Sequence, residues 1–308
     1  MRDRFNVDFA ELLNFLENID RWNDAKVGIL PLLESVNSSH MCFDSTIQSN
    51  KPDVTFITSL FKGGKYLHGY LDNVFNAASF CNGEVVIVDA NCDGSESSII
   101  NAYLKNNPKF KSICKYIELE TDPGLYECWN LAIKEARGRY VSNANLDDRR
   151  SPFHTKKIID FLDRSQNYAA ATGDIFAVNQ GDLRNWYEVK DGQIWFYDLG
   201  DFEVSKKDLY LIDAEGKFHS RNIMHCMPVW RRHLHQKFGY FDEEKYGTSA
   251  DWEFWLRLAN SGEKFYHLSN VFGQYLIDPN SHNRRDMKSL MKEDNIIHDY
   301  LFEGWENV

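Results

Sequence analysis

The chain has 308 residues, 43% of them hydrophobic and 14% aromatic, so it can bury a substantial core and is not a disordered sequence. Its formal net charge of -11 argues against nucleic acid or a strongly anionic membrane as the main partner, because both favour clustered Lys and Arg. No apolar run approaches the roughly 20 residues of a membrane-spanning helix. Six cysteines without C-x-x-C spacing indicate neither a zinc cluster nor a disulfide framework. We therefore expect a soluble, cytoplasmic protein.

The N-terminal residues form a separate predicted unit. Apolar residues recur there at helical spacing, and a stretch rich in Ser and Asn follows from Asn37 to Pro52. Residues 1–50 are therefore predicted to be a small helical appendage with a linker.

From Asp53 the pattern alternates between strands and helices. We expect strands at residues 54–58, 84–89 and 116–119 and one that begins at Tyr140. Helices are expected between them at residues 66–80, 95–104 and 126–136. Such alternation predicts an α/β fold with a largely parallel sheet covered by helices on both faces.

The strand that begins at Tyr140 ends in two adjacent carboxylates, Asp147 and Asp148, and Pro152 can begin a helix that runs to about Asp163. In open α/β sheets, ligands bind at the carboxyl ends of the strands. A hard divalent cation could be held there. The alternative is a solvated turn with a helix-capping Asp.

Two earlier strand ends also carry polar groups. Thr58 and Ser59 end the first strand, and Asp89 ends the second, shortly before Asp93-Gly94-Ser95. Their hydroxyl and carboxylate groups suit a ribose or a base, although ordinary turns with Asp or Ser caps explain the same residues. Neither loop matches G-x-G-x-x-G or the Walker pattern.

Beyond Gly173 the sequence changes to short aromatic strands and irregular loops. Helices are expected near residues 230–238 and 250–259, and a final helix from about Arg284 to Trp305. This half is predicted to shape the pocket of a second ligand.

Five segments together resemble family-two glycosyltransferases, over about Val54 to Leu276. They are the strand ending in Thr58-Ser59, the segment Val86 to Ser95, the segment Gly124 to Tyr140, the segment Asn145 to Pro152 and the segment Ala250 to Arg257. The resemblance implies the GT-A fold, a Rossmann-like and mostly parallel central sheet flanked by helices. It also implies sugar transfer from a nucleotide diphosphate donor, usually with inversion and with Mn²⁺ or Mg²⁺. Residues 51–278 would form this domain, with a nucleotide-sugar half at 51–152 and an acceptor half at 153–278, and residues 279–308 a helical extension.

The resemblance assigns donor contacts residue by residue. Thr58 and Asp89 would contact the nucleoside with Asn91 as a helper, and Asn130 would belong to the donor site. Ala90 stands where the family has a second nucleoside acid, so the base contact departs from the pattern.

For the metal, the resemblance implies Asp147 as the ligand and Asp148 as a supporting acid. Asn145 replaces the first acid of the family's D-x-D and brings a carbonyl oxygen but no charge, so the cation would be held more weakly and the amide could meet the ribose instead. Arg284 could neutralise the leaving diphosphate; a basic start to a surface helix is the alternative.

On the acceptor side, Asp251 is the candidate general base at the start of a helix; a plain N-cap Asp is the alternative. Glu253 would support the site or contact the acceptor, Trp230 could stack on a sugar and His225 could bond a hydroxyl. The histidines near residue 225 do not have metal-ligand spacing.

These assignments predict a metal-dependent, inverting enzyme that uses a nucleotide-sugar, most simply a UDP-sugar. The acceptor would be a glycan or lipid-linked glycan of bacterial surface polysaccharide synthesis, and peripheral association with the inner face of the plasma membrane stays open. Transfer would be non-processive, because the chain lacks the Q-x-x-R-W motif and the membrane helices of the processive synthases. Two other classes fit part of the pattern: a catalytically silent carbohydrate-binding module and a nucleotidyltransferase.

Overall fold

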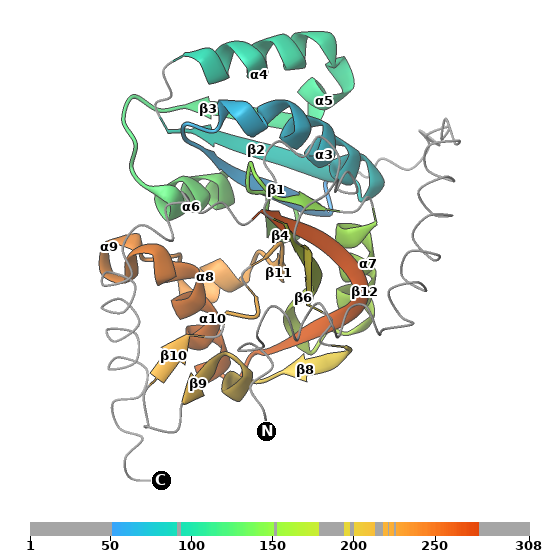
Figure 1. The fold of residues 1–308 in the computed structure, drawn as a ribbon, viewed down its shortest axis with the longest axis vertical. Coiled ribbons are helices and arrows are strands. Elements are labelled where there is room, and N and C mark those ends of the chain that lie inside the picture. Colours follow the sequence, from blue (N-terminus) through green and yellow to red (C-terminus); the bar gives the residue numbers. More distant parts are fainter. Residues whose placement is uncertain are drawn as a thin grey trace. The chain divides into compact units, whose positions relative to one another are not determined.

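The computed structural model describes residues 51–90, 94–150, 153–178, 194–197, 200–212, 218–220, 222–224 and 226–276 (Figure 1). The chain divides into two units, Met1–Ser49 and Asn50–Val308, and every described residue belongs to the second. The predicted N-terminal appendage and the extension from residue 279 lie outside the described residues. No helix in the described part of the chain is both long and apolar enough to cross a lipid bilayer.

The first half of the described chain alternates strands with helices, as the sequence predicts. Its elements are β1 (Val54–Leu60), the 3-10 turn η1 (Gly64–Tyr66), α3 (Leu67–Phe80), β2 (Gly83–Asp89), α4 (Ser95–Asn106), α5 (Pro108–Ile113), β3 (Cys114–Glu118), α6 (Leu125–Glu135) and β4 (Tyr140–Asn143). Every residue of β2 and β4 is buried, which suits parallel strands covered on both faces.

One central sheet runs in the order β3-β2-β1-β4-β11-β6-β12-β5. Strands β3, β2, β1 and β4 are parallel to one another, whereas β11 (Val229–Arg231) is antiparallel to both β4 and β6 (Tyr168–Val178). The long strand β12 (Lys264–Leu276) pairs in parallel with β6 and in antiparallel with the short β5 (Arg149–Arg150). The α/β fold with a central sheet flanked by helices is thus confirmed, with one antiparallel strand inside the sheet.

The remaining elements belong to the second half. They are α7 (His154–Arg164), β7 (Ile194–Tyr197), β8 (Phe202–Val204), η2 (Lys206–Asp208), β9 (Tyr210–Ile212), β10 (Phe218–Ser220), α8 (Leu234–Phe238), α9 (Glu243–Tyr246), η3 (Gly247–Ser249) and α10 (Ala250–Asn260). Strand β7 pairs with β6, β8 with β12, and β9 with β10.

Two cores lie on the two faces of the sheet. Along β1, Phe56 and Leu60 pack with α3 and α7 in one core, whereas Ile57 packs with α6 and α10 in the other. Successive side chains of a strand point to opposite faces, so β1 contributes to both.

The predicted helix at residues 230–238 is wrong in its first part. Val229–Arg231 form β11, which fills the space between β4 and β6, and helix α8 begins only at Leu234. Three residues are too few to show a strand's alternation, so the neighbouring helical pattern dominated the prediction.

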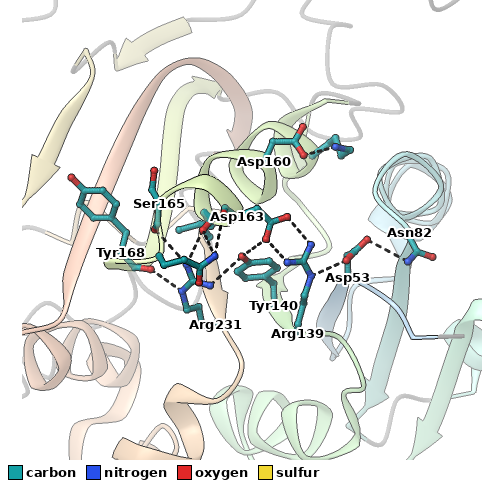
Figure 2. A network of polar contacts seen from close by, with 12 residues as sticks. Asp53, Asn82, Arg139, Tyr140, Asp160, Asp163, Ser165, Tyr168 and Arg231 are labelled. Atoms are coloured by element: carbon teal, nitrogen blue, oxygen red, sulfur yellow. Dashed lines mark hydrogen bonds and ion pairs between the residues drawn. The ribbon is translucent and has the colours of Figure 1, made fainter. Parts of the chain in front are cut away.

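A polar network anchors the amino end of β4 (Figure 2). Arg139 is paired with the carboxylates of Asp53 and Asp163. Arg231 donates to the hydroxyl of Tyr140 at 3.2 Å, and Tyr140 in turn donates to Asp163 at 2.8 Å. These contacts fix α7 and β11 to the start of β4. The carboxyl end of the same strand is therefore held in a defined place.

Candidate active site

Three strand ends meet at the carboxyl edge of the parallel strands. In register, Leu60 of β1 lies opposite Asp89 of β2, and Ile57 lies opposite Asn143 of β4. The loop after β1 packs so closely on the turn after β4 that a Cβ on Gly63 would overlap the side chain of Leu146. The three strand ends therefore lie together at the place where open α/β sheets bind ligands.

The two carboxylates of the turn after β4 have different environments. Asp147 is partly exposed. Asp148 is 5% exposed and accepts hydrogen bonds from Asn145 Nδ2 at 2.9 Å and from the backbone N–H of Leu276 at 3.4 Å. Burial, followed by the charge of neighbouring Asp147, raises the pKa of Asp148 above its usual value. Of the pair, Asp147 is the more exposed carboxylate.

Two arginines that the sequence analysis assigned no role hold this turn. Arg149 donates to the backbone oxygens of Leu146 and Asp148, both at 2.7 Å, on either side of Asp147. Arg150 donates to Asn143 O at 2.5 Å at the end of β4. Charged side chains in a short buried segment are stable only when paired, so Arg-Arg directly after the acidic pair was the signal that could have revealed this role.

The structure treats the two predicted nucleoside contacts, Asp89 and Thr58, differently. Asp89 is 3% exposed, and its Oδ2 accepts a hydrogen bond from Tyr116 at 2.5 Å; its nucleoside contact stays a prediction. Thr58 is fully buried and donates its hydroxyl proton to Ala144 O at 2.9 Å, so the hydroxyl of Tyr70, 2.6 Å away, must donate to it. The structure does not agree with a nucleoside contact for Thr58, which instead links β1 to the turn after β4.

Asn130 is also a structural residue. Its amide exchanges two hydrogen bonds with the backbone of Phe241, at 2.8 and 3.1 Å, and its Nδ2 also lies 3.3 Å from Glu127. The side chain is 3% exposed. The predicted donor contact of Asn130 is therefore corrected to a link between α6 and the segment before α9.

Two acceptor-side assignments are corrected in the same way. Trp230 is 1% exposed and lies in the core between β11 and α10, so neither face of its ring is open to a sugar. Glu253 is 1% exposed and forms an ion pair with Arg257 at 2.9 Å; burial raises its pKa. Glu253 supports α10 and does not present a surface to an acceptor. His225, Asn91 and Arg284 lie outside the described residues.

Asp251 is held by side chains from two other parts of the chain. It is the second residue of α10, where Ser249 is the N-cap, so Asp251 is not itself the N-cap residue. Its Oδ1 accepts from the hydroxyl of Tyr126 at 2.9 Å and its Oδ2 accepts from Asn222 Nδ2 at 2.8 Å. Helix α6 follows the carboxyl end of β3, so Tyr126 in its first turn places Asp251 at the same edge of the sheet as the Asp147 turn.

The residues of the turn after β4 fit a divalent cation whose coordination is completed by the substrate. Among the described residues, no group of three or more His, Cys, Asp and Glu side chains could enclose a metal. Mg²⁺ and Mn²⁺ in nucleotide sites are commonly held by one or two protein carboxylates while substrate phosphates complete the shell. The partly exposed pair of Asp147 and Asn145 provides one carboxylate and one carbonyl oxygen, which suits such a site.

The model of glycosyl transferase family 2 matches residues 55–239, more than half of the chain. The chain belongs to glycosyl transferase family 2. The family predicted from the order of the five segments is confirmed.

The curated relatives of this family-2 chain are distant. An uncharacterized glycosyltransferase of Haemophilus influenzae is 20% identical over 69% of this chain and 62% of its own length. The uncharacterized glycosyltransferase YwdF of Bacillus subtilis is 26% identical over half of each chain, and MJ1057 of Methanocaldococcus jannaschii is 20% identical over 84% and 82%. The chain thus spans less than two thirds of the length of the first two relatives.

Solved structures share the fold of this family-2 domain. Residues 1–349 of S. aureus TarS in complex with UDP-GlcNAc align with a TM-score of 0.56 at 18% identity, over 83% of this chain and 73% of that one. The mannosyltransferase PcManGT of Pyrobaculum calidifontis in complex with GDP-Man and Mn²⁺ aligns with a TM-score of 0.52 at 17% identity, over 91% and 77%.

Proposed function

We propose that the chain is a metal-dependent, inverting, non-processive glycosyltransferase. It moves one sugar from a nucleotide diphosphate donor, a UDP-sugar in the first instance, to a hydroxyl of a glycan or lipid-linked glycan. The observation that carries the proposal is the edge of the sheet, where Asp147 is partly exposed while Asp148, Arg149 and Arg150 hold its turn. The structural neighbours were solved with UDP-GlcNAc or GDP-Man, which makes these two the first donors to test.

In the proposed donor site, the nucleoside lies near Asp89 at the end of β2 and the diphosphate near the Asp147 turn. Asp147 and the carbonyl oxygen of Asn145 would hold a divalent cation, and the cation would neutralise the charge that develops on the leaving diphosphate. Arg149 and Arg150 would keep the turn in place as the substrate binds, because they fix the backbone on both sides of Asp147.

In the proposed transfer step, Asp251 is the general base. The acceptor oxygen attacks the anomeric carbon from the face opposite the diphosphate, which inverts that carbon. The proton of the acceptor hydroxyl passes to the Asp251 carboxylate while the bond from the anomeric carbon to the diphosphate oxygen breaks. The products are the glycosylated acceptor and a nucleoside diphosphate. A nucleotidyltransferase would release pyrophosphate instead, and a silent binding module would release neither.

The donor site is tested by calorimetry of UDP, UDP-GlcNAc and GDP-Man with and without Mn²⁺. The wild-type protein should bind one of the nucleotide-sugars more tightly with Mn²⁺ than without it, and Asp147→Ala should lose this dependence. Asp160→Ala is the matched control, because this Asp lies on the surface of α7 with 44% of its side chain exposed. Undiminished, Mn²⁺-dependent binding by Asp147→Ala would remove Asp147 from the metal site.

A further inference from the structure

Tyr126 brings the first turn of α6 into contact with Asp251. Its ring is 4% exposed, and its hydroxyl lies 2.9 Å from Asp251 Oδ1 and 3.0 Å from the backbone oxygen of Thr248. Burial, and then the charge of Asp251, raise the pKa of Tyr126 well above its usual value. The phenol therefore keeps its proton at working pH, and its single O–H is the donor that these two acceptors share.

Two further hydrogen bonds hold the Asp251 carboxylate. Asn222 Nδ2 donates to Oδ2 at 2.8 Å, and the backbone N–H of Trp252 donates to Oδ1 at 2.8 Å. Of these three donors, only Trp252 belongs to the same helix as Asp251. The rotation of the carboxylate about its side-chain bonds is thus set by tertiary contacts.

The position of Tyr126 is itself fixed by the N-terminus of α6. Glu243 accepts hydrogen bonds from the backbone N–H groups of Tyr126 and Glu127, at 2.8 and 3.3 Å. This approach requires glycine at position 124, where φ is +105° and a Cβ would overlap the Glu243 carboxylate. Two further rings pack against Tyr126: its ring centroid lies 5.2 Å from that of Trp129 and 5.5 Å from that of Phe241.

We propose that Tyr126 is a positioning residue that orients the carboxylate of Asp251 for proton transfer. This inference rests on the proposed role of Asp251 as the base. Tyr126 is assigned no contact with the donor or the acceptor; it acts through Asp251. A hydrogen bond from a neutral donor to a carboxylate also stabilises the ionised form. Removal of the hydroxyl should therefore lower turnover and move the acid limb of the pH–rate profile to higher pH.

The test variant is Tyr126→Phe, which removes one oxygen and keeps the ring. Tyr103→Phe is the matched control, because the hydroxyl of Tyr103 also donates to a carboxylate, that of Asp72 at 2.7 Å, on the opposite face of the sheet. The assay is release of nucleoside diphosphate with water as the acceptor, from UDP-GlcNAc or from GDP-Man if that is the donor that binds. The expected result for Tyr126→Phe is about tenfold lower kcat, a donor KM within about twofold of wild type, and an acid limb moved up by about one pH unit. Tyr103→Phe should match wild type in all three.

A second variant tests the same inference if Tyr126→Phe folds poorly. Glu243→Gln weakens the cap of α6 and leaves the Tyr126 hydroxyl in place. It should lower kcat by a smaller factor than Tyr126→Phe does. If Asp251→Asn abolishes turnover while Tyr126→Phe and Tyr103→Phe give the same kcat and the same pH profile, the positioning role is overturned and the proposed function stands. If Asp251→Asn retains wild-type turnover, the assignment of the base fails first.

Discussion

Lowering the pH from 7 to 5 is expected to destabilise the fold through one buried histidine. His235 is 3% exposed and is stacked between the rings of Tyr240 and Phe254, at centroid distances of 5.3 and 4.7 Å. The indole N–H of Trp230 donates to His235 Nε2 at 2.9 Å. Because an indole can only donate, Nε2 must be unprotonated and the ring neutral, with its proton on Nδ1 facing Gly239 O at 3.0 Å.

The size of the effect follows from the shifted pKa. Burial lowers the pKa of His235 from 6.5 to about 4. Above pH 6.5 the imidazole ring is neutral in both the folded and the unfolded chain, so the full stability is present. Between the unfolded-state pKa of 6.5 and the folded-state pKa of about 4, the unfolded chain binds a proton that the folded chain does not, so the free energy of unfolding falls as the pH falls. The contribution of His235 is a loss of about 2 kcal/mol at pH 5 that approaches about 3 kcal/mol below pH 4.

Urea unfolding at pH 7 and pH 5 measures this loss. The difference in free energy of unfolding between the two pH values should be about 2 kcal/mol smaller in His235→Gln than in the wild type. His68→Gln, which changes an exposed histidine on α3, should keep the wild-type difference. An equal pH dependence in all three proteins would show that His235 is not held neutral by Trp230.

Two further substitutions test the turn that carries Asp147. Asn145→Asp should tighten Mn²⁺ binding roughly tenfold in the presence of UDP, because it adds a charged ligand, and should cost stability because it replaces the donor 2.9 Å from Asp148 Oδ2. Equal or weaker affinity in a calorimetric Mn²⁺ titration would indicate that Asn145 serves the turn alone. Arg150→Met should lower the free energy of unfolding by about 3 kcal/mol, because buried acceptors lose their charged partner, whereas Arg164→Met on the surface of α7 should change it by less than about 0.5 kcal/mol. A urea midpoint of Arg150→Met equal to that of Arg164→Met would contradict the account of the turn.

The elements that the sequence predicted well carry strong local patterns. Strands 54–60 and 83–89 are short runs rich in β-branched and apolar residues, and helices 67–80, 125–135 and 250–260 each have a regular apolar stripe, so composition, length and periodicity are enough to find them. The order of the motifs then gave the family, because a fixed order constrains more than any one segment does.

The misjudged residues depend on partners distant in sequence. Thr58 and Asn130 have the polarity of ligand contacts, but their acceptors and donors are the backbones of Ala144 and Phe241, and no local pattern names such a partner. The sequence predicts that Trp230 stacks on a sugar, because an aromatic residue has the same appearance in sequence whether it lies in a core or in a binding site.

Asp251, the candidate base, shows what the sequence can and cannot predict about one residue. The sequence located Asp251 at the start of a helix but did not show what holds its carboxylate. Its carboxylate is held by Tyr126, in the first turn of α6, and by Asn222, in an irregular stretch. Tertiary contacts of this kind appear only once the chain is folded.

The most direct test of the account compares donor binding and turnover in Asp251→Asn and wild type. Asn keeps the size of the side chain and an oxygen that can accept from Tyr126, so the fold and donor affinity should be preserved. Release of nucleoside diphosphate from the bound nucleotide-sugar should fall by about 10²–10⁴-fold, the usual contribution of a positioned base. Wild-type release by Asp251→Asn, or pyrophosphate as the product of the wild-type protein, would contradict the proposed glycosyl transfer through Asp251.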